Sequence, residues 1–154
     1  MSEGSRQVNV FVADDAPEVR KRLVALVRTI RGAEVLGESD SVRGAIDGAL
    51  NPDVDTLLLD LQLLDGTGLD VLAAIKPQRP ELRVIVLSNF TSSQHCKASL
   101  AAGADVFLDK SCEFKRIPQI LRDWLSTPAS DSDLAGTTAT IQQLKENHVR
   151  LRLG

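Results

Sequence analysis

The chain has 154 residues, of which 43% are hydrophobic and 25% are charged, a balance that supports a globular domain with a full apolar core. Its formal net charge is −3, so the chain as a whole lacks the basic surface that nucleic-acid binding requires, and we expect no direct contact with nucleic acid. No stretch is apolar over the length that spans a bilayer, and residues 1–9 lack the apolar core of a signal peptide. We therefore expect a cytoplasmic protein without membrane insertion.

Short apolar runs recur along the first 110 residues and predict strands. Residues 57–59 and 84–87 are apolar at every position, which is typical of strands covered by helices on both faces. Each run ends at a polar residue, and each is followed by a segment with helical spacing. The expected strands, in chain order, are residues 8–13, 35–37, 56–59, 82–87 and 105–108.

The segments between the strands carry helix signals. Pro17 suits the first turn of a helix, where its missing N–H costs nothing, and Ser41 suits a helix N-cap. Residues 65–68, Asp-Gly-Thr-Gly, are turn chemistry. The expected helices run from Pro17 to before Gly32, from Ser41 to before Asn51, from about Leu69 to Lys76, from Ser92 or Ser93 to before Gly103, and from about Glu113 to Leu125.

Five strands alternate strictly with five helices, which predicts a parallel sheet with right-handed crossovers. The fold class is doubly wound, flavodoxin-like α/β, and we expect the strand order 2-1-3-4-5. Residues 1–125 form this domain. Residues 126–140, of which seven of fifteen are Ser or Thr, are expected to be a linker, and residues 141–154 a short helical or disordered tail.

Polar residues follow four of the five expected strands. Asp14 and Asp15 follow the first strand, Asp60 the third, Ser88 the fourth and Lys110 the fifth. Ligands of doubly wound sheets bind beyond the carboxyl ends of the strands, so these five side chains should gather at one edge. One aspartate at a strand end is usually only a helix cap or a turn residue, but five such residues at one edge favour a site.

Three carboxylates at one edge need cationic compensation. At an effective dielectric constant of about 20, two like charges about 4 Å apart repel by about 4 kcal/mol. Lys110 supplies part of the compensation, and a hard divalent cation such as Mg²⁺, which binds carboxylates and phosphate oxygens, would supply the rest. A carboxylate nucleophile, a cation site, a hydroxyl and an ammonium are the groups that phosphoryl transfer requires.

Residues 7–125 resemble the receiver domain of bacterial response regulators, the CheY-like family. The motifs that carry the resemblance are residues 10–15 (VFVADD), 57–61 (LLLDL), 65–68 (DGTG), 86–88 (VLS), 102–105 (AGAD), Phe107 and 110–111 (KS). The resemblance implies that Asp60 is the phosphoacceptor. It also implies that Asp15, Asp60 and the backbone carbonyl of Gln62 hold Mg²⁺, with Asp14 contacting the ion through water.

By the same resemblance, Ser88 and Lys110 bind the phosphoryl oxygens, and Phe107 occupies the aromatic switch position that responds to Ser88. An ordinary core role for Phe107 is the alternative. Two residues depart from the family pattern, because Leu64 and Ser111 stand where the family usually has prolines. The first change predicts a less rigid loop, and the second removes a cis-proline beside Lys110.

The DGTG and DKS motifs are more similar to those of receivers that carry a helix-turn-helix output domain. Only 29 residues follow Leu125, however, so the function that the resemblance implies is that of a stand-alone response regulator. It would take a phosphoryl group from a histidine kinase or phosphotransfer protein, catalyse its own phosphorylation and dephosphorylation, and signal by contact with a downstream protein. The alternatives are a pseudo-receiver that acts only as an interaction module, and a phosphoryl-relay intermediate without allosteric output. A flavin-binding domain is disfavoured because Asp14 and Asp15 would repel a phosphate, and a phosphohydrolase because the usual Asp-x-Asp spacing is absent.

Overall fold

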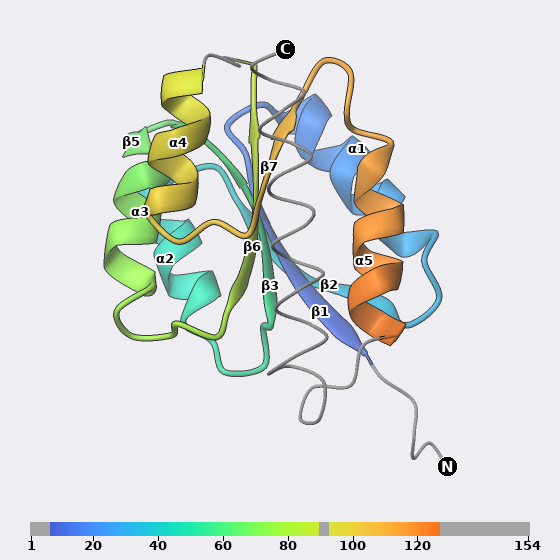
Figure 1. Ribbon diagram of the computed structural model, residues 1–154. Helices are drawn as coiled ribbons and strands as arrows, with labels where there is room; N and C mark the ends of the chain where they lie inside the picture. Colours follow the sequence, from blue (N-terminus) through green and yellow to red (C-terminus); the bar gives the residue numbers. More distant parts are fainter. Residues whose placement is uncertain (1–6, 90–92, 127–154) are drawn as a thin grey trace.

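A computed structural model describes residues 7–89 and 93–126. A five-stranded parallel sheet runs through the middle of the domain, with α1 and α5 on one face and α2, α3 and α4 on the other (Figure 1). The strand order is β2-β1-β3-β6-β7, which is the predicted 2-1-3-4-5 order once the small hairpin β4–β5 is left out of the count. The doubly wound α/β fold is confirmed. The expected tail, 141–154, and the expected linker beyond Ser126 lie outside the described residues.

The elements follow the alternation that the sequence predicts. The sheet strands are β1 (Val8–Ala13), β2 (Ala33–Ser39), β3 (Thr56–Asp60), β6 (Arg83–Ser88) and β7 (Val106–Asp109), and the hairpin strands are β4 (Gln62–Leu63) and β5 (Gly66–Thr67). The helices are α1 (Pro17–Arg28), α2 (Val42–Ala49), α3 (Gly68–Ile75), α4 (Ser93–Ala101) and α5 (Arg116–Ser126).

The strands divide their side chains between two hydrophobic layers. Leu57 and Leu59 of β3 face the layer under α2, α3 and α4, whereas Leu58 faces the layer under α1 and α5. All five residues of β3 are buried because successive side chains of a strand point to opposite faces and both faces are covered. This explains why the central strands are apolar throughout rather than alternating.

Local signals account for the helix starts. The Ser41 hydroxyl accepts the N–H of Gly44, as expected of an N-cap, and Thr67 forms a reciprocal capping box with Asp70 at the start of α3. Pro17 occupies the first turn of α1.

Strand β2 is longer than the predicted 35–37, and two further differences change the local structure. The hairpin β4–β5 lies where only a turn was expected, since Gln62 pairs with Thr67 and Leu63 with Gly66. Helix α5 starts at Arg116, not near Glu113, because residues 110–115 form turns in which the Glu113 side chain accepts a backbone N–H from Asp109. Short strands and side-chain-bonded turns leave no periodic apolar pattern, so the spacing rules could not detect them.

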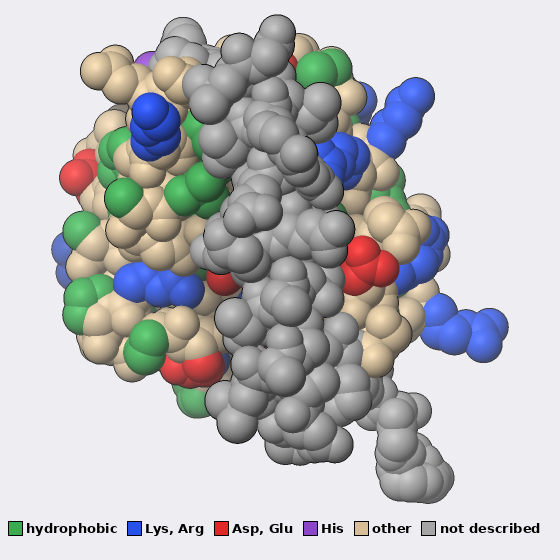
Figure 2. Space-filling view, in the orientation of Figure 1, with side chains coloured by type: hydrophobic (Ala, Val, Ile, Leu, Met, Phe, Trp, Pro, Cys, Tyr) green, Lys and Arg blue, Asp and Glu red, His purple; other side chains and the backbone are tan. Residues whose placement is uncertain are grey.

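On the parts of the surface that are not covered by grey residues in Figure 2, the hydrophobic side chains are scattered. Among the described residues, only Leu36 and Leu64 are large hydrophobic side chains that are exposed. No helix in residues 7–89 or 93–126 combines the length and the apolar character needed to cross a membrane.

A buried hydroxyl in α4 gives a stability prediction. Ser99 is 0% exposed, and its Oγ has no hydrogen-bond partner among the described residues. A buried, unpaired polar group is costly, so Ser99→Ala should raise the free energy of unfolding by about 1 kcal/mol in urea denaturation. Gln94→Ala, an exposed change on the same helix, measures the gain in helix propensity alone. A Ser99→Ala protein no more stable than Gln94→Ala would contradict the prediction.

Candidate functional site

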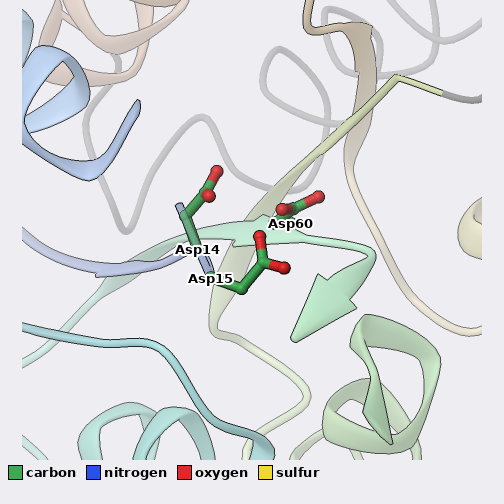
Figure 3. Close-up of side chains that lie close together, drawn as sticks. All are labelled: Asp14, Asp15 and Asp60. Carbon is green, nitrogen blue, oxygen red and sulfur yellow. The ribbon is translucent and has the colours of Figure 1, made fainter. Parts of the chain in front are cut away.

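Three carboxylates lie together beyond the carboxyl ends of β1 and β3 (Figure 3). Asp14 and Asp15 directly follow β1, and Asp60 is the last residue of β3; one carboxylate oxygen from each lies within 4.8 Å of the others. Asp14 is 0% exposed and Asp60 is 2% exposed, while Asp15 is partly exposed. The parallel pairing of β1 with β3 brings these residues together, as the sequence predicts.

Lys110 brings a positive charge into this cluster from the end of β7. Its Nζ lies 2.8 Å from Asp60 Oδ2 and 2.9 Å from Asp14 Oδ2, and its side chain is 7% exposed. Asp14 Oδ2 has no partner other than this ion pair among the described residues. Three carboxylates and one ammonium leave two negative charges in the cluster when all are ionised.

The buried setting changes the protonation of these groups. Burial, opposed by the hydrogen bond from Lys110 and reinforced by the charge of Asp14, raises the pKa of Asp60 to about 6. Burial alone would lower the pKa of Lys110, but the hydrogen bonds and charges of Asp60 and Asp14 outweigh it and hold the pKa of Lys110 above its ordinary value. Lys110 therefore stays charged near neutral pH. The pKa of Asp60, by contrast, lies close enough to neutral pH for the carboxyl group to change its protonation in mildly acidic solution.

Backbone donors orient two of the carboxylates. The Gln62 N–H donates to Asp60 Oδ1 at 3.2 Å, and the Ala16 N–H donates to Asp14 Oδ1 at 2.8 Å. The guanidinium of Arg20, on α1, donates to the backbone carbonyl of Asp14 at 2.8 Å. The other carboxylate oxygen of Asp14 and of Asp60, Oδ2 in each, is the one paired with Lys110.

Ser88 lies at this edge of the sheet, whereas Phe107 lies two register positions further into the sheet. Ser88 is the last residue of β6, is 1% exposed, and pairs in register with Asp109 at the end of β7. Its carbonyl accepts the N–H of Lys110 at 2.9 Å. Phe107, on the central part of β7, is 0% exposed and belongs to the core layer under α2, α3 and α4. The structure thus places the ring inside the domain.

Gly68 allows α3 to start directly against the end of β3. A Cβ on Gly68 would lie 2.7 Å from the carbonyl oxygen of Asp60, a contact that only backbone movement could relieve. The Gly68 N–H also donates to the Leu61 carbonyl at 2.9 Å. A side chain at this position would therefore displace the backbone that carries Asp60.

The loop after Asp60 is held by two hydrogen bonds, one of which a proline at position 64 could not make. The N–H of Leu64, which stands where the resemblance predicted proline, donates to the Asp40 carbonyl at 3.0 Å. The neighbouring Asp65 carboxylate accepts the Val42 N–H at the start of α2, and this bond lowers the pKa of Asp65. These bonds tie the loop to α2, so a Leu at this position does not leave the loop without support.

The donor set fits a small divalent cation. Carboxylate oxygens are the ligands that Mg²⁺ prefers, and the charge of the cation would cancel the two negative charges left by Lys110.

Sequence reasoning identified the aspartates and Lys110, and the structure brings them together. It missed Arg20, the Gln62 N–H and the close approach of Gly68 to Asp60, because backbone donors and close approaches leave no signal in the residue types alone.

This sheet edge and this group of aspartates with a lysine define a receiver domain. A family model of the response regulator receiver domain matches residues 10–122, and the chain belongs to that family. Its expected resemblance to receivers is thereby confirmed.

Curated relatives include longer regulators. The transcriptional activator DevR/DosR of Mycobacterium tuberculosis is 29% identical over 116 residues, covering 75% of this chain and 54% of that protein. The nitrate/nitrite response regulator NarP of Escherichia coli is 32% identical over 123 residues, covering 80% of this chain and 55% of NarP. The chain spans about half the length of the curated relatives that it matches.

Solved structures show the same fold. The receiver domain of the putative response regulator NarL from Mycobacterium tuberculosis superimposes with a TM-score of 0.72 at 26% sequence identity, covering 80% of this chain and 99% of that chain. RcsB of Salmonella typhimurium gives a TM-score of 0.70 at 26% identity, covering 84% of this chain and 67% of that chain.

Proposed function

We propose that this protein is a cytoplasmic response regulator that accepts a phosphoryl group on Asp60 from a histidine kinase or phosphotransfer protein and signals by protein contact. The observation that supports it most directly is the buried cluster in which Lys110 Nζ lies within 3 Å of both Asp14 and Asp60. Membership of the receiver family gives the same reading.

The transfer step uses one oxygen of Asp60 as the nucleophile. That oxygen bonds to phosphorus as the bond from phosphorus to the donor imidazole nitrogen breaks, and the electron pair of the broken bond stays on that nitrogen. Lys110 and Ser88 then contact oxygens of the transferred group, so the charge that arrives is met by an ammonium and a hydroxyl.

Asp15, Asp60 and the backbone carbonyl of Gln62 would hold Mg²⁺ directly, and Asp14 would contact it through water. When bound, the ion supplies positive charge that offsets the carboxylates and the incoming phosphoryl oxygens. Two backbone N–H groups orient the carboxylates that would surround the ion. Asp14 is held by the Ala16 N–H, and Asp60 by the Gln62 N–H, so the acidic side chains keep their direction.

Metal dependence tests this function in the whole protein. Acetyl phosphate with Mg²⁺ should add one phosphoryl group per chain, measured by intact mass, and excess chelator should prevent the addition. The metal is required because two uncompensated negative charges would repel the donor. Equal labelling with and without chelator would reject the proposed metal role, and the absence of labelling with both acetyl phosphate and a phosphorylated kinase would favour the pseudo-receiver alternative.

The switch from Ser88 to Phe107 gives a second test. Both side chains are buried, and Phe107 lies in the layer that α4 covers. Beryllofluoride with Mg²⁺, a mimic of the phosphoryl group, should shift amide NMR signals in residues 93–100 and 105–115 as well as around the aspartates, because the bound group biases two conformations.

Ser88→Ala is the matched variant for that test. It should retain beryllofluoride binding, read from the signals near Asp60, while the distant shifts shrink. Shifts confined to the surroundings of Asp14, Asp15 and Asp60 in the unaltered protein would reject the switch and favour a phosphoryl-relay intermediate without allosteric output.

A further inference from the structure

The turn that carries Lys110 joins the end of β7 to α5 (Figure 1). Lys110 is the first residue after β7, and its own N–H donates to the Ser88 carbonyl at 2.9 Å. Its side chain then reaches back to Asp14 and Asp60. A lysine side chain is long and flexible. The position of the Lys110 backbone therefore determines what fraction of the time its ammonium group occupies the site.

Asp109 fixes the backbone on the far side of Lys110. One oxygen of the Asp109 carboxylate accepts both the N–H of Ser111 at 2.8 Å and its hydroxyl at 2.6 Å. These bonds close a tight turn around Lys110, so the chain leaves that residue in one direction.

Glu113 fixes the backbone on the near side. Its Oε1 accepts the N–H of Asp109 at 2.8 Å, and its own N–H donates to the Asp109 carbonyl at 2.8 Å. The guanidinium of Arg116 lies 3.1 Å from the other oxygen, and the Glu113 side chain is only 13% exposed. Glu113 thus joins both backbone groups of Asp109 to the start of α5.

We propose that Glu113 and Asp109 are positioning residues that hold the Lys110 ammonium at the phosphoryl site, an inference that rests on the proposed role of Lys110 in phosphoryl transfer. Neither carboxylate is among the three that gather around the cation site. They act through the backbone on both sides of Lys110. Four hydrogen bonds hold this backbone, and each of them involves a side-chain or main-chain group of Asp109 or Glu113.

The test measures two quantities in the 154-residue chain: the rate of labelling by acetyl phosphate at saturating Mg²⁺, and the affinity for Mg²⁺ from amide NMR titration. Glu113→Ala should slow labelling about fivefold, the effect of losing one typical hydrogen bond. The affinity for Mg²⁺ should not weaken, because a loosened Lys110 competes less for Asp14 and Asp60. Glu113→Gln keeps an oxygen that can accept the Asp109 N–H and should label at close to the normal rate.

A double-mutant cycle separates positioning from general destabilisation. Lys110→Ala should slow labelling on the order of a hundredfold. Adding Glu113→Ala to it should change the rate no further, because the side chain that Glu113 positions is gone. Glu81→Ala is the matched control, since Glu81 also pairs with an arginine, Arg79, but at the amino-terminal edge of the sheet. It should leave both quantities unchanged.

Three results would overturn the inference while leaving the proposed function intact: normal labelling by Glu113→Ala, multiplied effects in the double variant, or loss of Mg²⁺ affinity in parallel with labelling. If Glu113→Ala does not fold, Asp109→Ala, which removes the acceptor for Ser111, replaces it in the same cycle with the same criteria. Because the inference needs a role for Lys110, it would also fall if the Lys110→Ala variant labelled at Asp60 at the normal rate. Failure of the unaltered protein to label at all would instead reject the proposed function, and the inference with it.

Discussion

Asp60→Asn should abolish phosphoryl labelling altogether, by acetyl phosphate or by a phosphorylated kinase. The amide keeps the size of the side chain and can still accept the Gln62 N–H, but it lacks the anionic oxygen that attacks phosphorus. The rate should fall below detection, on the order of a thousandfold or more, because the covalent step is lost rather than weakened. Intact-mass measurement after a fixed incubation reads the result.

Asp53→Asn is the matched control for that change. Asp53 is exposed in the turn before β3, at the opposite edge of the sheet, so it loses the same charge without touching the cluster. It should label like the unaltered protein. A label that persists in Asp60→Asn, located by peptide mapping at another carboxylate, would show that Asp60 is not the acceptor.

The same Asp60→Asn change should stabilise the protein in the absence of Mg²⁺ at neutral pH. Burial raises the pKa of Asp60 to about 6 from an ordinary value of 3.8, so keeping it ionised in the folded state has a cost. The change should therefore raise the free energy of unfolding by about 1–3 kcal/mol above pH 7. Lys110 keeps an ion-pair partner in the variant, because Asp14 remains 2.9 Å away.

The pH dependence has a definite sign. Between about pH 4 and pH 6 the folded state binds more protons at Asp60 than the unfolded state, so this group makes the unaltered protein less stable as pH rises through that window. The advantage of Asp60→Asn should be about a third of its full size near pH 4.5 and reach its full size near pH 7. Urea denaturation across this range, with chelator present, measures it. An advantage that does not change with pH would mean that Asp60 titrates near its ordinary pKa.

Added Mg²⁺ should reverse the order of the two proteins. A ligand that binds only the folded state stabilises it in proportion to the logarithm of its concentration over its dissociation constant. The unaltered protein has three carboxylates to offer and the variant two, so Mg²⁺ should stabilise the former more. If both proteins gain equally, Asp60 is not a ligand of the ion.

The sequence was sufficient for the fold and for most of the site because both depend on residue type at strand ends. Leu57, Leu58 and Leu59 mark a doubly covered strand, and Asp60 then falls at its carboxyl end. Chain order alone places Asp14, Asp15 and Lys110 at the same edge once the sheet order is known.

The sequence could not show the contacts that depend on three-dimensional approach. Glu113 lies in a segment that read as helix, and only the structure shows its carboxylate turned back to the Asp109 N–H. The replacement of proline by Leu64 predicted a less rigid loop. In the structure the Leu64 N–H donates to the carbonyl of Asp40, 24 positions earlier in the chain. Side-chain and backbone polar groups pair according to distance in space, and no periodic pattern reports that distance.

The division of β3 between two core layers restricts how the length of the chain can vary. Leu58 packs on the α1 and α5 side and its neighbours on the other, so removing one residue within β3 would exchange the two layers for every residue beyond the deletion. It would also turn Asp60 away from Asp14 and Lys110. The turn at residues 51–53, by contrast, is exposed and lies outside both layers. Insertions and deletions should therefore be tolerated at the amino-terminal edge of this strand, while the register between Thr56 and Asp60 stays fixed.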